Sequence, residues 1–297
     1  MTLNIDEQPP AHANENEGND YKDQSRKYHE NVNAAYVLPE DEMENDRLYM
    51  QHYALKLAFG ANFDSPIEEE LEQGITVLDS GCGPGTWTLD MAQQYPQSKF
   101  YGLDISSVFP TEIKPSNTEF QLHNITEPAP FPENTFDYVH QRLLVMGLRN
   151  EEWKKVISNY LQVLKSNGYF EFTECTTDLV NGGPKMTLLM DCMKTIATMK
   201  DLHIEVYRDF ASYFEEAGAI NVRSRQLIAP FNHTNKVGEL LWKDYCMMFT
   251  ALKPIVAKTH PELASEEAYA KFMEETGEEC KEYKTHLIFS RCYGQKP

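Results

Sequence analysis

Two aspartates and three glycines form the group of residues whose types and spacing indicate a specific chemistry. Asp79 ends an apolar run, Gly81, Gly83 and Gly85 follow at alternate positions, and Asp104 ends the next apolar run. Glycines at this spacing permit backbone angles that a side chain would forbid, and they let a ligand approach the backbone closely. A carboxylate roughly twenty residues after such a turn is placed to accept hydrogen bonds from ribose hydroxyls.

The charge at the tip of the first strand distinguishes between classes of nucleoside ligand. A dinucleotide fingerprint has two residues before its last glycine, whereas residues 81–85 read Gly-Cys-Gly-Pro-Gly. A carboxylate at Asp79 repels a pyrophosphate and attracts an ammonium or sulfonium group. The pattern Asp-x-Gly-x-Gly-x-Gly resembles that of class I S-adenosylmethionine-dependent methyltransferases. The alternative is a glycine-rich turn between strand and helix that binds no ligand.

Hydrophobic periodicity predicts the elements that position these residues. Strands are expected over 75–78, 100–103, 119–122, 138–144, 169–173, 221–228 and 286–289. Helices are expected after Thr86 as N-cap and at about 41–60, 153–164, 186–200, 209–217, 237–259 and 266–283. Alternation of this kind with short connections favours an α/β fold with one parallel sheet wrapped by helices.

Length and charge limit the domain organisation and the partners. The chain has 297 residues and a formal net charge of −19, which disfavours a nucleic acid as partner because phosphates are repelled. Residues 1–25 are rich in Asn, Glu and Asp and predict a disordered acidic leader before a single domain over 26–297. Within that domain we expect an N-terminal helical cap over 26–70 and helical insertions at about 178–218 and 233–283.

The cysteines and the apolar stretches indicate the compartment. Six cysteines form neither a CxxC pair nor a zinc-finger spacing, so we expect six free thiols and no metal site. No secretory signal is visible, and no stretch approaches the roughly eighteen apolar residues of a membrane span. We therefore expect a cytoplasmic protein without a membrane partner, with the nucleus as the alternative location.

The first predicted helix, over 41–60, has two interpretations. Its inward candidates are Met43, Leu48, Tyr53 or His52, Leu55 and Leu57. Its charged residues are typical of a solvated face. Alternatively, the helix closes over a ligand and Arg47 meets a carboxylate, since a guanidinium donates two parallel hydrogen bonds.

Further polar residues lie at the predicted ends of other strands. His140, Gln141 and Arg142 belong to the carboxyl end of the fourth strand, and Glu174 follows the fifth. Ligands of open α/β sheets bind outside these ends. Asn124 follows the third strand, and its side-chain carbonyl is able to accept a hydrogen bond from an adenine amino group. A purely structural polar cluster is the alternative for the residues of the fourth strand.

A more specific pattern precedes the glycine turn. Residues 36–47 read Tyr-Val-Leu-Pro-Glu-Asp-Glu-Met-Glu-Asn-Asp-Arg, and Gln51 and His52 follow. This string resembles the opening of the fungal LaeA-like methyltransferases, also called TAM-domain proteins. Residues 78–87, 102–106, 136–142 and 164–169 continue in that group's order, so the resemblance covers about 28–175 well and the rest in outline.

The resemblance implies a fold and a cofactor but no substrate. The fold is a Rossmann-like, mostly parallel sheet of seven strands whose last strand is antiparallel, and the cofactor is S-adenosylmethionine. In many class I enzymes the position of Asn124 is acidic, and this departure concerns a single contact. The residues expected to bind the cofactor are Tyr36, Arg47, Asp79, Gly81, Gly83, Gly85, Trp87, Asp104, Ile105, Asn124, Ile125, Gln141 and Arg142.

The sequence leaves the catalytic base and the methyl acceptor open. A general base helps when the acceptor is a hydroxyl or an ammonium, and the candidates are His52, His140 and Glu174. The Met- and aromatic-rich second half, including the predicted helix over 237–259 as a lid, favours a small-molecule acceptor of the secondary-metabolite kind. The acidic surface keeps a protein-directed methyltransferase or regulator as the alternative, and a non-enzymatic scaffold is the third reading. The oligomeric state is not indicated.

Overall fold

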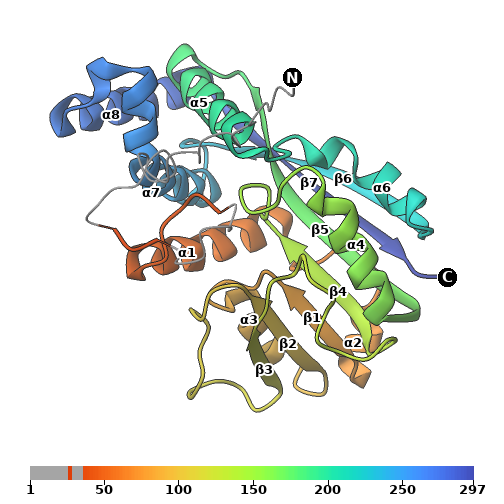
Figure 1. Cartoon of the computed structure of the whole chain (residues 1–297). Coiled ribbons are helices and arrows are strands. Elements are labelled where there is room, and N and C mark those ends of the chain that lie inside the picture. The colour runs from red at the N-terminus through yellow and green to blue at the C-terminus, as the bar shows by residue number, and fades with distance from the viewer. Residues whose placement is uncertain (1–25, 29–35) are drawn as a thin grey trace, which may run out of the picture.

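A computed structural model describes residues 26–28 and 36–297, so the leader predicted over 1–25 lies outside the described residues. Within this part, seven strands form one sheet in the order β3-β2-β1-β4-β5-β7-β6 (Figure 1). The strands are β1 (Thr76–Ser80), β2 (Lys99–Asp104), β3 (Thr118–Leu122), β4 (Phe136–Arg142), β5 (Leu164–Val180), β6 (Ile220–Pro230) and β7 (His286–Gln295). Strand β7 is antiparallel to β5 and β6, whereas the other pairs are parallel. The predicted Rossmann-like sheet with an antiparallel last strand is therefore confirmed.

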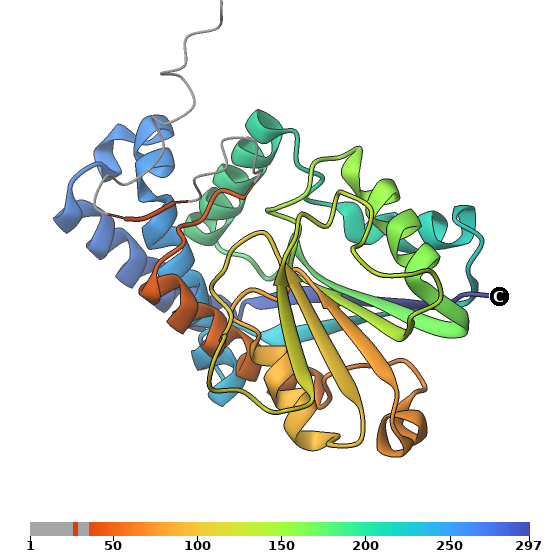
Figure 2. The ribbon, with the colours of Figure 1, turned by 60° about the horizontal axis from the view of Figure 1, so that its bottom comes forward.

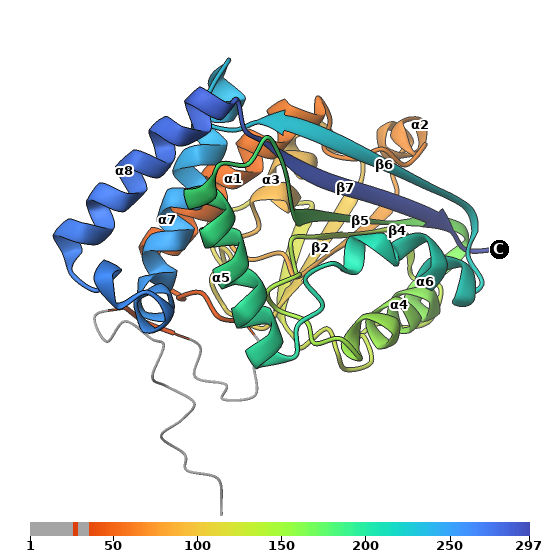
Figure 3. The same cartoon turned by 90° about the horizontal axis from the view of Figure 1, so that it is seen from above.

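The helices cover both faces of the sheet and one of its ends. They are α1 (Glu42–Phe59), α2 (Glu68–Gln73), α3 (Thr86–Gln94), α4 (Glu152–Val163), α5 (Pro184–Lys200), α6 (Phe210–Glu216), α7 (Lys236–Thr259) and α8 (Glu266–Tyr283), with short 3-10 helices η1 (Val206–Arg208) and η2 (Pro261–Leu263). Helices α4 and α6 lie on one face and α2 and α3 on the other (Figure 3). Helices α1, α5, α7 and α8 gather beside the end on which the strands converge in Figure 2. The limits of the N-terminal cap and of the two insertions stay predictions.

Side-chain alternation along β4 decides which of its residues reach which face. Tyr138 and His140 point towards α3, where both rings lie against Trp87. Gln141 points the opposite way and accepts a hydrogen bond from Tyr160 of α4 at 2.7 Å. Because successive side chains of a strand point to opposite faces, adjacent polar residues cannot share one site.

Helix α1 buries a polar face, and part of the predicted inward set is wrong. Met43, Tyr53 and Leu57 are 55%, 52% and 58% exposed, whereas His52 and Leu55 are buried. The predicted limits hold, since Asp41 caps the N-terminus by accepting from the amide of residue 44 and Gly60 ends the helix. The prediction chose apolar residues for the buried face. Helix α1 instead packs against α7 and α3 as well as the sheet, and it buries polar residues that bond to side chains of those two helices.

The polar contact between α1 and α7 is a buried ion network. The guanidinium of Arg47 donates to both carboxylate oxygens of Glu44 at 2.9 and 2.6 Å and to Asp244 of α7 at 2.6 Å. Gln51 also donates to Asp244 at 3.1 Å. The side chains of Arg47, Glu44 and Asp244 are at most 4% exposed, so the interpretation of a solvated charged face is wrong for Glu44 and Arg47.

We expect Arg47→Met to destabilise the protein strongly, because it leaves two buried carboxylates without their counter-charge. Removal of one partner from a buried ion pair costs about 3–5 kcal/mol of unfolding free energy. Urea-induced unfolding measures the loss. The control is Lys154→Met, which removes the exposed pair with Glu216 and is expected to unfold near the wild-type midpoint. Coinciding curves for Arg47→Met and the wild type would contradict the importance of the network.

Candidate functional site

The turn between β1 and α3 depends on three left-handed glycines. Gly81, Gly83 and Gly85 have φ values of 70°, 54° and 76°. A Cβ on Gly81 would lie 2.7 Å from the side chain of Leu144, so that position has no room for one. A Cβ on Gly83 would meet only Leu48, at 3.6 Å across the cavity described below. The bare backbone at Gly83 therefore faces open space, as close approach of a ligand requires.

Asp104 holds this turn in place from the tip of β2. Its two carboxylate oxygens accept from the amide of Gly83 at 2.7 Å and from the amide of Ser106 at 2.9 Å. Burial raises the pKa of Asp104 to about 6. Each oxygen keeps a second lone pair, so the carboxylate is still able to accept from a ligand hydroxyl.

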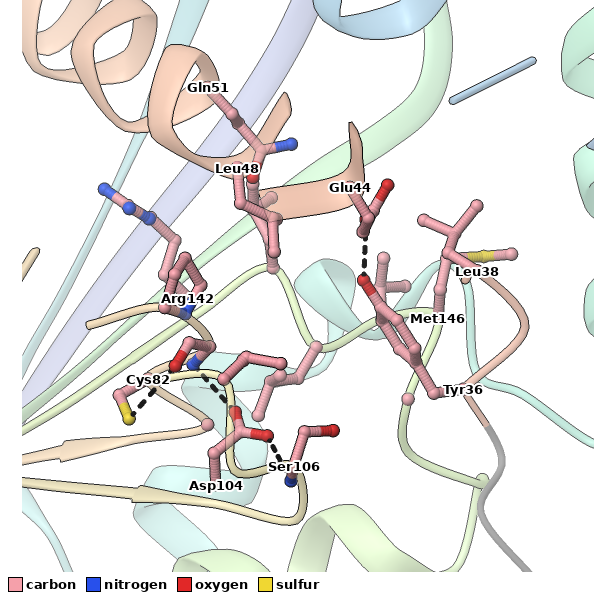
Figure 4. Close-up of a pocket in the computed structure, with 18 of the residues that line it drawn as sticks. Tyr36, Leu38, Glu44, Leu48, Gln51, Cys82, Asp104, Ser106, Arg142 and Met146 are labelled. Atoms are coloured by element: carbon pink, nitrogen blue, oxygen red, sulfur yellow. Dashed lines mark hydrogen bonds between the residues drawn. The ribbon is translucent and has the colours of Figure 1, made fainter. Parts of the chain in front are cut away.

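One cavity connects the glycine turn with the helices at the end of the sheet (Figure 4). On one side it is lined by the segments that follow β2 and β3, including Ile105, Asn124 and Ile125. On the other side its wall is mainly apolar: Leu48, Val145, Met146, Met193, Leu241, Tyr245, Met248 and Phe289. Of the methionines of α5, only Met193 lines the cavity, whereas Met186 and Met190 are core and Met199 is exposed. A polar and an apolar compartment therefore share one space.

Asp79 and His140 form a fixed pair on the wall of this cavity. Nδ1 of His140 lies 2.9 Å from Oδ1 of Asp79, while Oδ2 accepts from Thr88 at 2.6 Å. The imidazole stacks on Trp87 with ring centroids 3.8 Å apart. Burial lowers the pKa of His140 to about 4, so the ring is neutral at neutral pH. With its proton on Nδ1 towards the carboxylate, the lone pair is at Nε2, which has no partner among the described residues.

The two other candidate bases do not line the cavity. His52 is fully buried between Asp90, at 3.1 Å from Nε2, and Arg142, at 3.3 Å from Nδ1. Glu174 is not at a strand end, because pairing with β7 extends β5 to Val180. Both are corrections to the sequence-based assignment.

Glu174 supports the loop that follows β4 from beneath. Its carboxylate oxygens accept from the amides of Leu144 at 2.7 Å and Val145 at 3.2 Å. Leu143, which precedes them, has a left-handed φ of 54°. Residues 143–148 line the cavity along their whole length. Glu174 therefore holds a wall of the cavity in shape without facing it.

Two expected cofactor contacts find other partners in the structure. Gln141 is fully buried on the face of α4 and does not line the cavity, which corrects its assignment. Arg47 lines the cavity, but its guanidinium already bonds to Glu44 and Asp244. Its contact with a cofactor carboxylate stays a prediction that these bonds disfavour.

The remaining expected residues lie on the cavity wall except Gly85, where an added Cβ would meet the ring of Phe120 at 2.7 Å. Tyr36 donates to Glu44 at 3.2 Å (Figure 4). The side-chain carbonyl of Asn124 accepts from the amide of Thr126 at 3.1 Å and from its hydroxyl at 2.9 Å, so it is partly used within the chain. Trp87, Ile105, Ile125 and Arg142 line the same space. Their individual contacts with a cofactor stay predictions.

Sequence reasoning missed two residues of this wall. Thr86 was expected to be an N-cap, but Gly85 occupies that position and Thr86 begins α3. Oγ1 of Thr86 and Nε2 of His123 are buried and have no partner among the described residues, although both residues line the cavity. The sequence features that could have identified them are the position of Thr86 directly after Gly85 and that of His123 directly after β3. Unpaired polar atoms beside a bare-backbone turn and a carboxylate are what a polar nucleoside ligand needs, so the residues present fit such a cofactor.

Two other kinds of site find no support in the described chain. Within residues 26–28 and 36–297, no group of three or more His, Cys, Asp and Glu side chains is arranged to hold a metal. None of the helices described combines the length and the apolar character that a membrane crossing requires.

The sheet order, the glycine turn and the carboxylate at the tip of β2 define a class I S-adenosylmethionine-dependent methyltransferase. The family described as "Methyltransferase domain" matches residues 77–168, from β1 into β5. The predicted class, cofactor and resemblance to the LaeA-like group are confirmed.

Similar proteins include regulators and enzymes. The "Secondary metabolism regulator LAE1" of Cochliobolus heterostrophus is 27% identical over 227 residues, which are 73% of this chain and 72% of that protein. The "N-methyltransferase sirN" of Leptosphaeria maculans is 33% identical over 48% of this chain, and the match spans only half of that protein. The solved structure of Haemonchus contortus phosphoethanolamine N-methyltransferase 2 aligns with a TM-score of 0.50 at 17% identity, over 84% of this chain and 57% of its own. That likeness concerns the fold.

A matched pair of glycine substitutions tests the role of the turn. Gly83 and Gly60 both have a left-handed φ, and neither has an atom closer than 3.6 Å to an added Cβ. We expect Gly83→Ala and Gly60→Ala each to lower the unfolding free energy by about 1–2 kcal/mol. Only Gly83→Ala is expected to weaken binding of S-adenosylhomocysteine, by about tenfold or more in calorimetric titration. Equal affinities of the two variants would remove Gly83 from the site.

The buried carboxyl of Glu174 predicts a pH dependence of stability. Burial raises its pKa to about 8, well above the value in an unfolded chain. The folded state then binds the additional proton between about pH 4.5 and 8, so stability falls as the pH rises through that window. We expect the unfolding free energy of the wild type to fall by a few kcal/mol between pH 5 and 8, and Glu174→Gln should remove this fall. Urea unfolding at each pH measures both. Glu216→Gln, at an exposed acid, is the control and should keep the wild-type slope.

Proposed function

We propose that this protein transfers the methyl group of S-adenosylmethionine to a small, largely apolar acceptor of the secondary-metabolite kind. One observation carries the proposal. The cavity that begins at the glycine turn and Asp104 continues without interruption to the apolar wall formed by Met193, Tyr245 and Met248. A donor site and an apolar acceptor site within one space are what direct transfer between two bound molecules requires.

The polar compartment supplies the groups that would hold the cofactor. Asp104 offers acceptor lone pairs for the ribose hydroxyls, and Gly83 offers backbone without a side chain. Asp79 places a negative charge near the cationic part of the cofactor, and Asn124 and Ile125 lie where the adenine is expected. The bound cofactor supplies an electrophilic methyl group on a positively charged sulfur.

The chain contributes to the reaction by positioning the two substrates, by excluding water and by offering the lone pair of one side chain. Helices α1 and α7, joined by the buried Arg47–Asp244 pair, cover the apolar compartment. Of the three candidate bases, His140 alone lines the cavity, with Nε2 as acceptor and Asp79 behind it. Since the pKa of His140 is lowered to about 4, it is a weak base and suits an acceptor whose own lone pair is already available.

The relatives support two kinds of acceptor. The name of sirN describes an N-methyltransferase, which agrees with a small-molecule acceptor. Another relative, 27% identical and from Emericella nidulans, is named "Protein-methionine methyltransferase laeA", which agrees with the protein-directed alternative. The apolar wall of the cavity favours the small molecule. A cytoplasmic or nuclear location and the absence of nucleic-acid and membrane partners stay predictions.

Loss of the carboxylate at the tip of β2 tests the cofactor site. We expect Asp104→Asn to weaken binding of S-adenosylmethionine by about tenfold or more in isothermal titration, because the amide has one acceptor oxygen in place of two. Asp191→Asn removes an exposed carboxylate on α5 and is the control, with unchanged affinity expected. Equal affinities for Asp104→Asn and the wild type, with both proteins folded, would contradict the assignment of Asp104 to the ribose.

Transfer of a labelled methyl group identifies the class of acceptor. The protein is incubated with methyl-labelled S-adenosylmethionine and an extract of its source cells, and the products are separated into organic-soluble and protein fractions. We expect the label in the organic-soluble fraction, and Gly83→Ala should reduce it. Label confined to protein would replace this proposal with the protein-directed alternative.

A further inference from the structure

Arg142, which is partly buried, differs from the buried Arg47 and Arg291 because it forms no ion pair with an acid of the described residues. Its Nη2 donates to Nδ1 of His52 at 3.3 Å, and no carboxylate of residues 26–28 or 36–297 lies within ion-pair distance. Arg47 and Arg291, by contrast, each pair with two acids. A guanidinium carries five N–H donors. Arg142 lines the cavity, and most of its donors have no hydrogen-bond partner among the described residues.

A chain of hydrogen bonds fixes the orientation of Arg142. His52 is fully buried, and its Nε2 lies 3.1 Å from Oδ2 of Asp90. Asp90 is itself anchored by Lys56 at 2.6 Å and Asn62 at 2.7 Å. Because the carboxylate accepts from Nε2, the lone pair of His52 is at Nδ1 and faces Arg142. One corner of the guanidinium is thus held while the rest stays available.

The order of the strands places Arg142 opposite the nucleoside end of the cavity. Asp104 ends β2 and Asn124 follows β3, whereas Arg142 ends β4, on the far side of β1. Figure 4 shows Arg142 between Gln51 of α1 and Cys82 of the glycine turn. A nucleoside with its ribose on Asp104 and its base towards β3 extends its other end across the turn towards β4. In S-adenosylmethionine that end is an amino acid with a free carboxylate.

We propose that Arg142 binds the carboxylate of the cofactor's amino-acid end, and that His52 and Asp90 are positioning residues that hold its guanidinium. The assignment rests on the proposed function. It gives Arg142 the role that the sequence suggested for Arg47, whose donors are taken by Glu44 and Asp244. It also explains why His52 is not a base, since its free lone pair faces Arg142.

Two ligands that differ in the amino-acid end test this assignment. S-Adenosylhomocysteine has the carboxylate, whereas 5′-methylthioadenosine keeps the adenosine and the sulfur and lacks the amino acid. In calorimetric titration we expect Arg142→Met to weaken the first ligand by roughly 10- to 100-fold and to leave the second within about twofold. Arg208→Met, at an exposed arginine, is the control and should change neither affinity.

Substitutions of His52 test the positioning role. We expect His52→Leu to weaken S-adenosylhomocysteine by a smaller factor than Arg142→Met and to leave 5′-methylthioadenosine unchanged. His52→Gln retains one acceptor and one donor and should restore much of the affinity. A purely structural role of His52 predicts equal losses for both ligands and no rescue, and that result would overturn the relay.

The outcomes distinguish a failure of this inference from a failure of the proposed function on which it rests. Wild-type affinity of Arg142→Met for S-adenosylhomocysteine overturns the assignment of Arg142 while the proposed function stands. Equal weakening of both ligands by Arg142→Met also overturns it, because the contact would then not be specific to the carboxylate. Failure of the wild-type protein to bind either ligand would overturn the proposed function as well.

Discussion

The hydrogen bond from the amide of Gly83 to the carboxylate of Asp104 is the contact on which the site depends. It spans 2.7 Å and joins the glycine turn after β1 to the tip of β2. Together with the bonds from the amides of Gly81 and Cys82 to the carbonyl oxygen of Leu103, at 2.8 and 2.9 Å, it fixes the orientation of the turn relative to β2. With it, the bare backbone and the carboxylate meet at the same edge of the sheet. Both residues of that junction line the cavity, as does Thr86, the first residue of α3.

Buried charge organises the rest of the cavity. Arg47, Glu44 and Asp244 neutralise one another between α1 and α7, so the helical cover is specified by ions as well as by apolar contact. Glu174, whose pKa is raised to about 8 by burial, supports the loop over 143–148 from beneath through its carboxyl oxygens. Arg142 is the exception, since the described residues offer it no acid. A guanidinium that lines a cavity and has no carboxylate partner among the described residues provides a place for an anion.

Much of the fold and part of the site were predictable from the sequence. Local signals set the ends of α1, α7 and α8, because caps and apolar periodicity depend on residues a few positions apart. The pairing of β7 with β5 was not local, and it extended β5 past Glu174 to Val180. For the same reason Gln141 was misplaced. Adjacent positions on a strand look equivalent at its predicted end, yet they face opposite sides of the sheet.

The sequence by itself determined the turn, the two carboxylates at the strand tips and hence the class of cofactor, because residue type and spacing along one βαβ unit suffice for these. Only the tertiary structure decided which charges are already paired. Arg47 and Arg142 are equally plausible partners of a carboxylate when the chain is read in order. Asp244, 197 residues away from Arg47, and His52, 90 residues away from Arg142, distinguish them. Contacts between elements remote in sequence arise from packing, and neither spacing nor composition records them.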